Sequence, residues 1–155
     1  MSTGNGTLKQ KNDSLDLVSV VTLTSAQVKA LRATPIVVVP APRTGYVNIL
    51  VQGAIKLKYG GTNAFTESTA NLAYKYTSGA GVQISQTIES TGFIDQTVST
   101  ETSAIPKIDA IVASSASSGA PIVLHNLGAG EIAGNAANDN LISVVTIYKQ
   151  VPWSV

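Results

Sequence analysis

Residues 46–59 read YVNILVQGAIKLKY, and this stretch decides the fold. From Val47 to Tyr59 every odd position is apolar or glycine, whereas the even positions include the polar residues Asn48, Gln52, Lys56 and Lys58. Because successive side chains of a β-strand point to opposite faces, this period of two predicts a long strand with one face in water. Gly53 has no side chain to pack in the middle of the run, which indicates a β-bulge or a bend there.

Other stretches carry strand patterns as well, namely residues 17–23, 36–39, 72–77, 82–88, 122–127 and 141–148. Prolines at both ends of 36–39 confine that run to a short strand or an edge position. The runs 72–77 and 82–88 flank a glycine-containing turn and predict a hairpin. The run 141–148 is apolar on both faces, which is typical of a central strand.

Little of the remaining chain predicts helix. Thr24 and Gln27 form a capping box, and Pro35 restricts the backbone before it, so one short helix is expected near residues 25–32. The polar stretch that ends at Ser103 predicts a single helical turn, and residues 113–119 predict a surface loop.

Composition supports an all-β fold. Val, Ile and Thr account for 46 of the 155 residues, and β-branched side chains suit a pleated surface better than a helix. Short strands without alternating long helices indicate an antiparallel β-sandwich or a barrel. The number of strands and the long connections favour a jelly-roll-like sandwich, with residues 1–14 as a flexible N-terminal arm and 15–155 as a single β-sandwich domain.

Charge excludes several classes of partner. Ten basic and nine acidic residues give a formal net charge of +1, and only 12% of residues are charged. Nucleic acid and anionic membranes are bound mainly through strong positive fields, so neither is expected as a partner. There are no cysteines, and no apolar run is long enough to cross a bilayer. No cofactor or metal is expected.

Candidate catalytic residues are few. His125 is the single histidine, and the Gly-x-Ser-x-Gly nucleophile motif is missing, so His125 is interpreted as a strand-edge or solvent-facing residue. A pair of carboxylates from Glu67, Asp95 or Glu101 has no supporting pattern. The glycine-rich stretch 128–134 lacks a following helix and is interpreted as a loop, and a cation held by Glu131 and Asp139 is the weaker hypothesis. The chain is therefore not expected to be an enzyme.

Aromatic side chains offer candidate partner contacts. Tyr59, Tyr74 and Tyr76 lie on the apolar phase of their strands, so we expect them in the core or at an interface. Phe65 and Trp153 are then the candidates for exposed rings, and Trp153 follows Pro152, where it would dock on its own domain or on a neighbour.

Taken together, residues 23–42, 45–59, 71–95 and 122–148 resemble small structural proteins in the virion gene clusters of tailed phages. The similarity spans about residues 17–150, and its most distinctive part is the segment from Thr24 to Val39. The resemblance implies a head decoration or cement protein, a β-sandwich that binds the major capsid protein as a homodimer or homotrimer. It would be made in the host cytoplasm and located on the capsid surface of the virion.

Two functions from different classes remain open. In the first, the domain self-associates through apolar strand faces and clamps adjacent capsid subunits, while the arm with Lys9 and Lys11 orders on the shell. In the second, it is a receptor- or glycan-binding module of a phage fibre or tail that uses loops 60–70 and 127–140. Phe65, beside Asn63 and Glu67, would supply the aromatic platform for a sugar.

Overall fold

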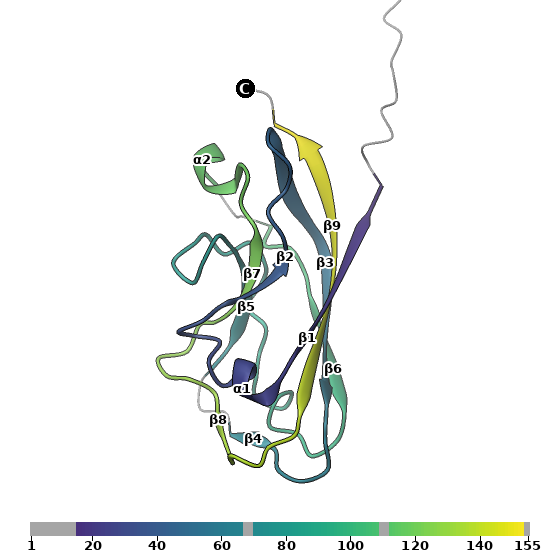
Figure 1. Cartoon of the computed structure of the whole chain (residues 1–155), viewed down its shortest axis with the longest axis vertical. Helices are drawn as coiled ribbons and strands as arrows, with labels where there is room; N and C mark the ends of the chain where they lie inside the picture. The colour runs from purple at the N-terminus through teal and green to yellow at the C-terminus, as the bar shows by residue number, and fades with distance from the viewer. Residues whose placement is uncertain (1–14, 67–69, 109–111, 154–155) are drawn as a thin grey trace, which may run out of the picture.

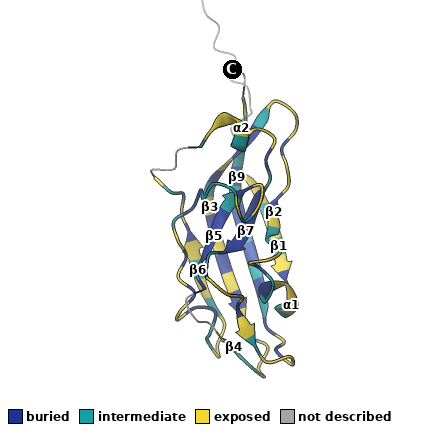
Figure 2. Cartoon of the chain, turned by 90° about the vertical axis from the view of Figure 1, so that its left-hand side faces the viewer, coloured by how far each residue is buried: buried dark blue, intermediate teal, exposed yellow. Residues whose placement is uncertain are grey.

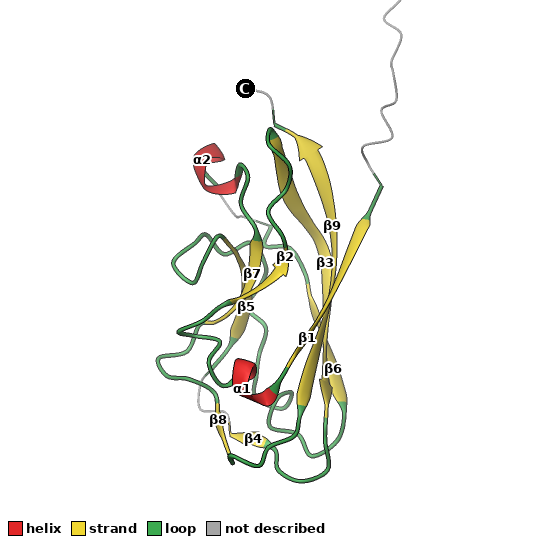
Figure 3. Cartoon of the chain, viewed as in Figure 1, coloured by secondary structure: helices red, strands yellow, loops and turns green. Residues whose placement is uncertain are grey.

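The computed structural model of the chain describes residues 15–66, 70–108 and 112–153. Its elements are β1 (Leu17–Leu23), α1 (Ser25–Val28), β2 (Ile36–Val39), β3 (Tyr46–Lys58), β4 (Phe65–Thr66), β5 (Leu72–Tyr76), β6 (Thr100–Ala104), α2 (Ser114–Ser117), β7 (Ile122–Asn126), β8 (Ala133–Gly134) and β9 (Leu141–Pro152). One sheet has the order β1-β9-β3-β6 and faces a second with the order β2-β7-β5, while β4 and β8 pair at one end (Figure 1). Only two short helices interrupt the strands and loops of the described ranges (Figure 3).

The strand pairing is that of a jelly roll. When residues 82–88 are counted as a strand and the β4-β8 pair is left aside, β1 pairs with β9, β2 with β7 and β3 with β6, all antiparallel. The innermost pair joins β5 to residues 82–88, because Leu72 and Ile88 exchange backbone hydrogen bonds of 2.9 and 2.8 Å. Such nested pairing is the double Greek key of jelly-roll proteins. The predicted antiparallel, jelly-roll-like sandwich is confirmed.

The predicted pairing between residues 72–77 and 82–88 is confirmed, but the prediction that residues 82–88 form a strand is wrong. The amide of Ile84 donates to the carbonyl of Tyr74 at 2.9 Å, as in a regular ladder. The amide of Tyr74 instead donates to the hydroxyl of Ser85 at 2.9 Å, so a side chain replaces a backbone acceptor. Residues 82–88 therefore pair through isolated bridges and form no continuous strand.

Strand β3 contains the expected bulge, two residues before the predicted position. Leu50 lies opposite Tyr148 and Gln52 lies opposite Ile147, so Val51 is the extra residue. A bulge moves every preceding side chain to the other face of the sheet.

The bulge corrects the predicted faces of the first half of β3. Ile49, expected inside, is 43% exposed, whereas Asn48, expected in water, is fully buried. Gly53 has a different role from the predicted one: a Cβ atom there would lie 2.6 Å from the hydroxyl oxygen of Tyr74. The glycine is needed for the close approach of this ring.

The prediction of a helical turn before Ser103 is wrong, because residues 100–104 form the edge strand β6. Its side chains are almost all polar, so no apolar period marks it, and only Ala104 is fully buried. The pairing with β3 places Glu101 opposite Lys56. Within the predicted loop 113–119 the chain makes one short helical turn, α2.

The two sheets bury their facing sides against each other, and the buried positions gather on β5 and β7 (Figure 2). Tyr74 is fully buried there, as predicted, and burial raises its pKa to about 12, an effect only partly opposed by the 3.4 Å contact of its hydroxyl with Thr146. Tyr76 is also buried, and its hydroxyl donates to the carbonyl of Asn48 at 2.5 Å. The prediction that both tyrosines belong to the core is confirmed.

Helix α1 starts as the sequence predicts but is shorter. The amide of Thr24 donates to the side-chain oxygen of Gln27 at 2.9 Å, and the amide of Gln27 donates back to the Thr24 hydroxyl at 3.4 Å. Regular helix ends at Val28 and turns continue to residue 33. Val28 and Leu31 are fully buried, so this segment closes one end of the core as the spacing of its apolar residues predicts.

Candidate interaction surface

On β1 and β9 the outer side of the four-stranded sheet is apolar, where a sandwich that faces only water would be polar. Val18 and Val20 on β1 are 61% and 63% exposed. The register places them opposite Ile147 and Val145 of β9, and Val145 is followed across the sheet by Ala54 of β3. We call these five residues the apolar face.

Strand β9 shows why both of its sides are apolar. Ile142, Val144 and Thr146 are fully buried in the core, and the residues between them are only half-buried. The alternation therefore points Val145 and Ile147 away from the core. The predicted central position of this strand is confirmed, since it lies between β1 and β3.

Polar residues frame the apolar face at both ends and on the β3 side, where the exposed Gln52 lies opposite Ile147. At one end Lys149 forms an ion pair with Asp16, with a distance of 3.6 Å between Nζ and Oδ1. At the other end Ser143 lies opposite Lys56, which in turn lies opposite Glu101. An apolar centre with a polar rim is the usual anatomy of a protein–protein interface.

The apolar face continues to β1, which forms an edge of the sheet among the described residues. Strand β1 contains neither a charged residue nor a proline. Its ladder partner in the described ranges is β9, and on its other side the hydroxyl of Ser19 donates to the carbonyl of Val38 at 2.5 Å. Edge strands usually carry charges or prolines that prevent pairing with another chain. This edge lacks these devices.

The prediction that Phe65 is exposed is wrong. Phe65 is 2% exposed and packs in the core cluster, where β4 and β8 close one end of the sandwich. The carbonyl of the neighbouring Asn63 accepts hydrogen bonds of 2.8 Å from the side chains of Asn138 and Asn140. Glu67 lies outside the described residues. The aromatic platform expected for a sugar is thus not formed by Phe65.

Trp153 is 44% exposed, which confirms its predicted exposure. Its backbone amide donates to the carbonyl of Gly45 at 2.7 Å and fixes the end of β9. The start of β1 and the end of β9 lie at the same end of the sandwich (Figure 1). Lys9 and Lys11 lie outside the described residues, and the segment that carries them joins the domain at this end.

The described residues among those considered for catalysis lie on different segments. His125 occupies the central strand β7 and is 8% exposed, so its prediction as an edge or solvent-facing residue is wrong. Asp95 accepts a hydrogen bond of 2.9 Å from the amide of Gly92, and Glu101 lies on β6. Within the described part of the chain no group of three metal-ligating side chains forms.

The glycine-rich stretch is a loop at residues 128–132, as predicted, but its last two residues, 133–134, form the short strand β8. The carboxylate of Glu131 accepts hydrogen bonds from the amides of Arg32 and Ala33 at 2.9 and 2.7 Å. Asp139, the other carboxylate considered for a cation, instead lies 3.3 Å from the hydroxyl of Thr62. The two carboxylates hold different loops.

Sequence reasoning missed Val18 and Val20 as surface residues. The signal that could have found them is the lack of polar alternation in residues 17–23 and 141–148. When two adjacent strands are apolar on both sides, both sides of their sheet are expected to be buried, one in the core and the other against a partner.

No family model matches the chain, and no curated protein matches its sequence. Among solved structures it is similar to a chain from a cryo-EM structure of a semi-empty virus-like particle of the giant freshwater prawn Macrobrachium rosenbergii nodavirus. The two share 10% identity with a TM-score of 0.31, over 92% of this chain and 97% of that one. The fold assignment rests on the strand pairing and not on this similarity. None of the described helices is long and apolar enough to cross a membrane.

Proposed function

We propose that this protein is a non-enzymatic structural protein of a phage virion, which binds the outside of the capsid and stabilises it. The observation that carries the proposal is the apolar face with its edge strand β1. The resemblance to tailed-phage decoration proteins supports the location on a phage capsid. The apolar face supports binding to other protein subunits. The expected partners are the major capsid protein and further copies of this chain.

A second copy is the occupant that the sequence of β1 favours. Residues 17–23 read LVSVVTL and in reverse LTVVSVL, so both leucines and the central Val20 coincide, while the other positions exchange valine with threonine or serine. Antiparallel pairing of two such strands about Val20 would place Leu17 opposite Leu23 and Val18 opposite the similarly shaped Thr22. A two-fold symmetric interface requires this self-complementarity. No like charges meet in this register.

The end of the sandwich that carries Trp153 is the proposed contact with the shell. It presents an exposed ring, the exposed side chain of Leu15 and the attachment of the lysine-containing arm. Each of these contacts is weak by itself. Copies that are joined to one another bind the particle at several points at once, and this avidity makes strong charge attraction unnecessary.

The proposal is tested with the variant Val20→Lys and the matched control Val37→Lys, which changes another exposed valine on an edge strand of the other sheet. Sedimentation velocity should show an oligomer for the wild type and the control, and a monomer for Val20→Lys. Co-sedimentation with capsids that lack the protein should detect binding, which Val20→Lys weakens through lost avidity. A monomeric wild type that does not bind capsids contradicts the proposal.

A further inference from the structure

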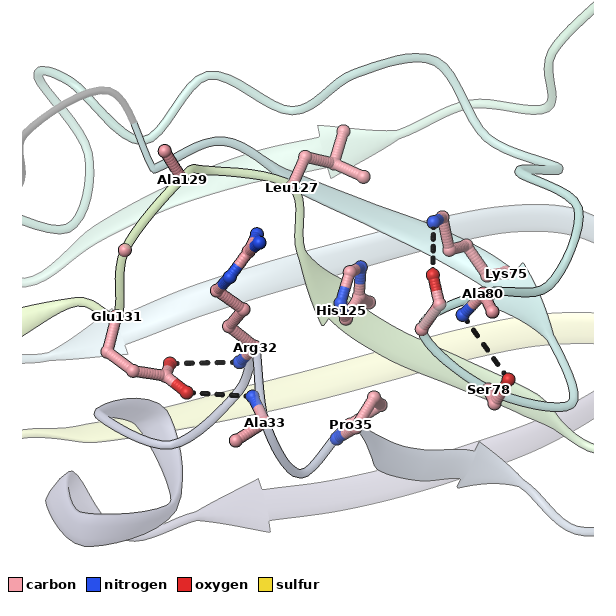
Figure 4. A pocket seen from close by; sticks show the side chains of 12 residues that line it. Arg32, Ala33, Pro35, Lys75, Ser78, Ala80, His125, Leu127, Ala129 and Glu131 are labelled. Atoms are coloured by element: carbon pink, nitrogen blue, oxygen red, sulfur yellow. Dashed lines mark hydrogen bonds between the residues drawn. The ribbon is translucent and has the colours of Figure 1, made fainter.

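The outer side of the other sheet contains an open cavity of about 900 Å³ (Figure 4). It lies over β5 and β7, between the turn at residues 78–81 and the loop at residues 127–131. Three basic side chains from separate segments line it: Arg32, Lys75 and His125. Such a concentration is notable in a chain with only 12% charged residues.

The acidic residue of the cavity does not neutralise these bases directly. Both oxygens of Glu131 are occupied by the backbone amides of Arg32 and Ala33. Arg32 donates through Nη1 to the carbonyl of Gly128, and Lys75 donates through Nζ to the carbonyl of Gly79. Since a guanidinium has five donors and an ammonium three, both groups have donors left for a ligand.

His125 lies between the other two bases, and its side chain is the least solvated of the three (Figure 4). It is 8% exposed, and its Nδ1 atom has no hydrogen-bond partner. Gly79 packs against the ring, because a Cβ atom there would lie 2.6 Å from Nε2. Buried ring nitrogens usually have a hydrogen-bond partner, so Nδ1 is an atom to which a ligand can contribute one.

We propose that this cavity binds an oxyanion, a carboxylate or phosphate group carried by a small ligand. Arg32 would hold the anion with its free donors, Lys75 would add a point charge, and His125 would donate once protonated. The volume lies in the range of roughly 300–1,000 Å³ found for small-molecule sites. The site is independent of the apolar face and of the virion role.

Protonation of His125 gives the site a measurable signature. Burial lowers the pKa of this ring most, and the charges of Lys75 and Arg32 lower it further. A hydrogen bond with the Arg32 backbone and the charge of Glu131 oppose this shift. A bound anion adds negative charge beside the ring and therefore raises that pKa. By linkage, the affinity for an anion whose own charge stays constant, such as glucuronate, rises as the pH falls.

The experiment follows the His125 ring by NMR while inorganic phosphate, glucuronate or neutral glucose is added at constant ionic strength. We expect saturable shifts with phosphate or glucuronate and none with glucose, together with a rise of the His125 pKa. The stronger of the two anions identifies the group that the site prefers. Shifts that do not saturate with either anion, or equal shifts with glucose, refute the proposal.

The variant Lys75→Gln removes one charge from the cavity, and Lys58→Gln is the matched control on β3. Lys75→Gln should weaken anion binding about tenfold, as expected for a charge-assisted hydrogen bond, while Lys58→Gln should leave it unchanged. Backbone spectra of both variants verify that they fold. Equal anion affinity in the two folded variants also refutes the proposal.

Discussion

Gly53 is the point in β3 at which the core has no room for a side chain. In the variant Gly53→Ala, the new methyl group would lie 2.6 Å from the Tyr74 hydroxyl oxygen and 3.0 Å from the Cβ atom of Ala104. Tyr74 is fully buried and cannot swing into water. We therefore expect Gly53→Ala to destabilise the fold by about 1–3 kcal/mol, the usual cost of overpacking.

The nearest obstacle is a single oxygen atom, so its removal should restore part of this stability. Tyr74→Phe alone loses a long hydrogen bond to Thr146 and costs about 1 kcal/mol. The double variant should be more stable than the sum of the single changes by about 1 kcal/mol, because the two residues are in contact. It should not recover fully, since Ala104 still crowds the methyl group.

Urea unfolding followed by circular dichroism measures these differences. Gly130→Ala is the matched control, because a Cβ atom there meets open space. Its stability should stay within about 0.5 kcal/mol of the wild type, as for most surface changes. A Gly53→Ala variant as stable as this control, or a strictly additive double variant, would refute the assignment of Gly53 to close packing against Tyr74.

Three further outcomes can be measured in the same way. Thr24→Ala removes the helix cap and should cost about 1 kcal/mol in urea, whereas Thr22→Ala on the outer side of β1 should cost much less. Phe65→Ala should lower the free energy of unfolding by about 3–5 kcal/mol, because the ring is in the core, and a loss of capsid binding without a loss of stability would contradict this position. The folded-state pKa of His125 is lowered, so the unfolded chain binds that proton more readily, and the stability it contributes is present above about pH 6.5 and lost as the pH falls toward the folded-state pKa. Stability measured between pH 7 and pH 5 should therefore fall more in the wild type than in His125→Gln, and parallel curves would show that His125 contributes nothing to the loss.

The sequence predicts the strands best where their side chains alternate or form long apolar runs. These patterns identify β3 and β9, and the capping box locates the start of α1. Strand β6 could not be found, because its side chains are polar and its pairing partner lies more than forty residues away in the chain. The bulge at Val51 could not be located from the sequence either. Its position depends on the register between β3 and β9, which are far apart in the chain.

The candidate surfaces are predicted less well than the fold. The sequence predicts exposure for Phe65 because its segment looks like a loop, but the pairing of β4 with β8 turns that ring into the core. Arg32, Lys75 and His125 are far apart in the sequence, and three-dimensional packing alone brings them around one cavity. Local patterns predict which side of a strand is apolar, but they do not predict which distant loops meet above it.

The apolar face and the basic cavity belong to different sheets, and each lies on the outer side of its own sheet. A second copy bound at β1 would therefore leave the cavity accessible, and a ligand in the cavity would leave β1 free. Two sites without shared residues or contacts have independent effects. We expect Val20→Lys to change the oligomeric state and leave phosphate affinity unchanged, and Lys75→Gln to do the reverse. If either variant changes both quantities, the two surfaces are coupled through the core, and the separation argued from the sheet order is wrong.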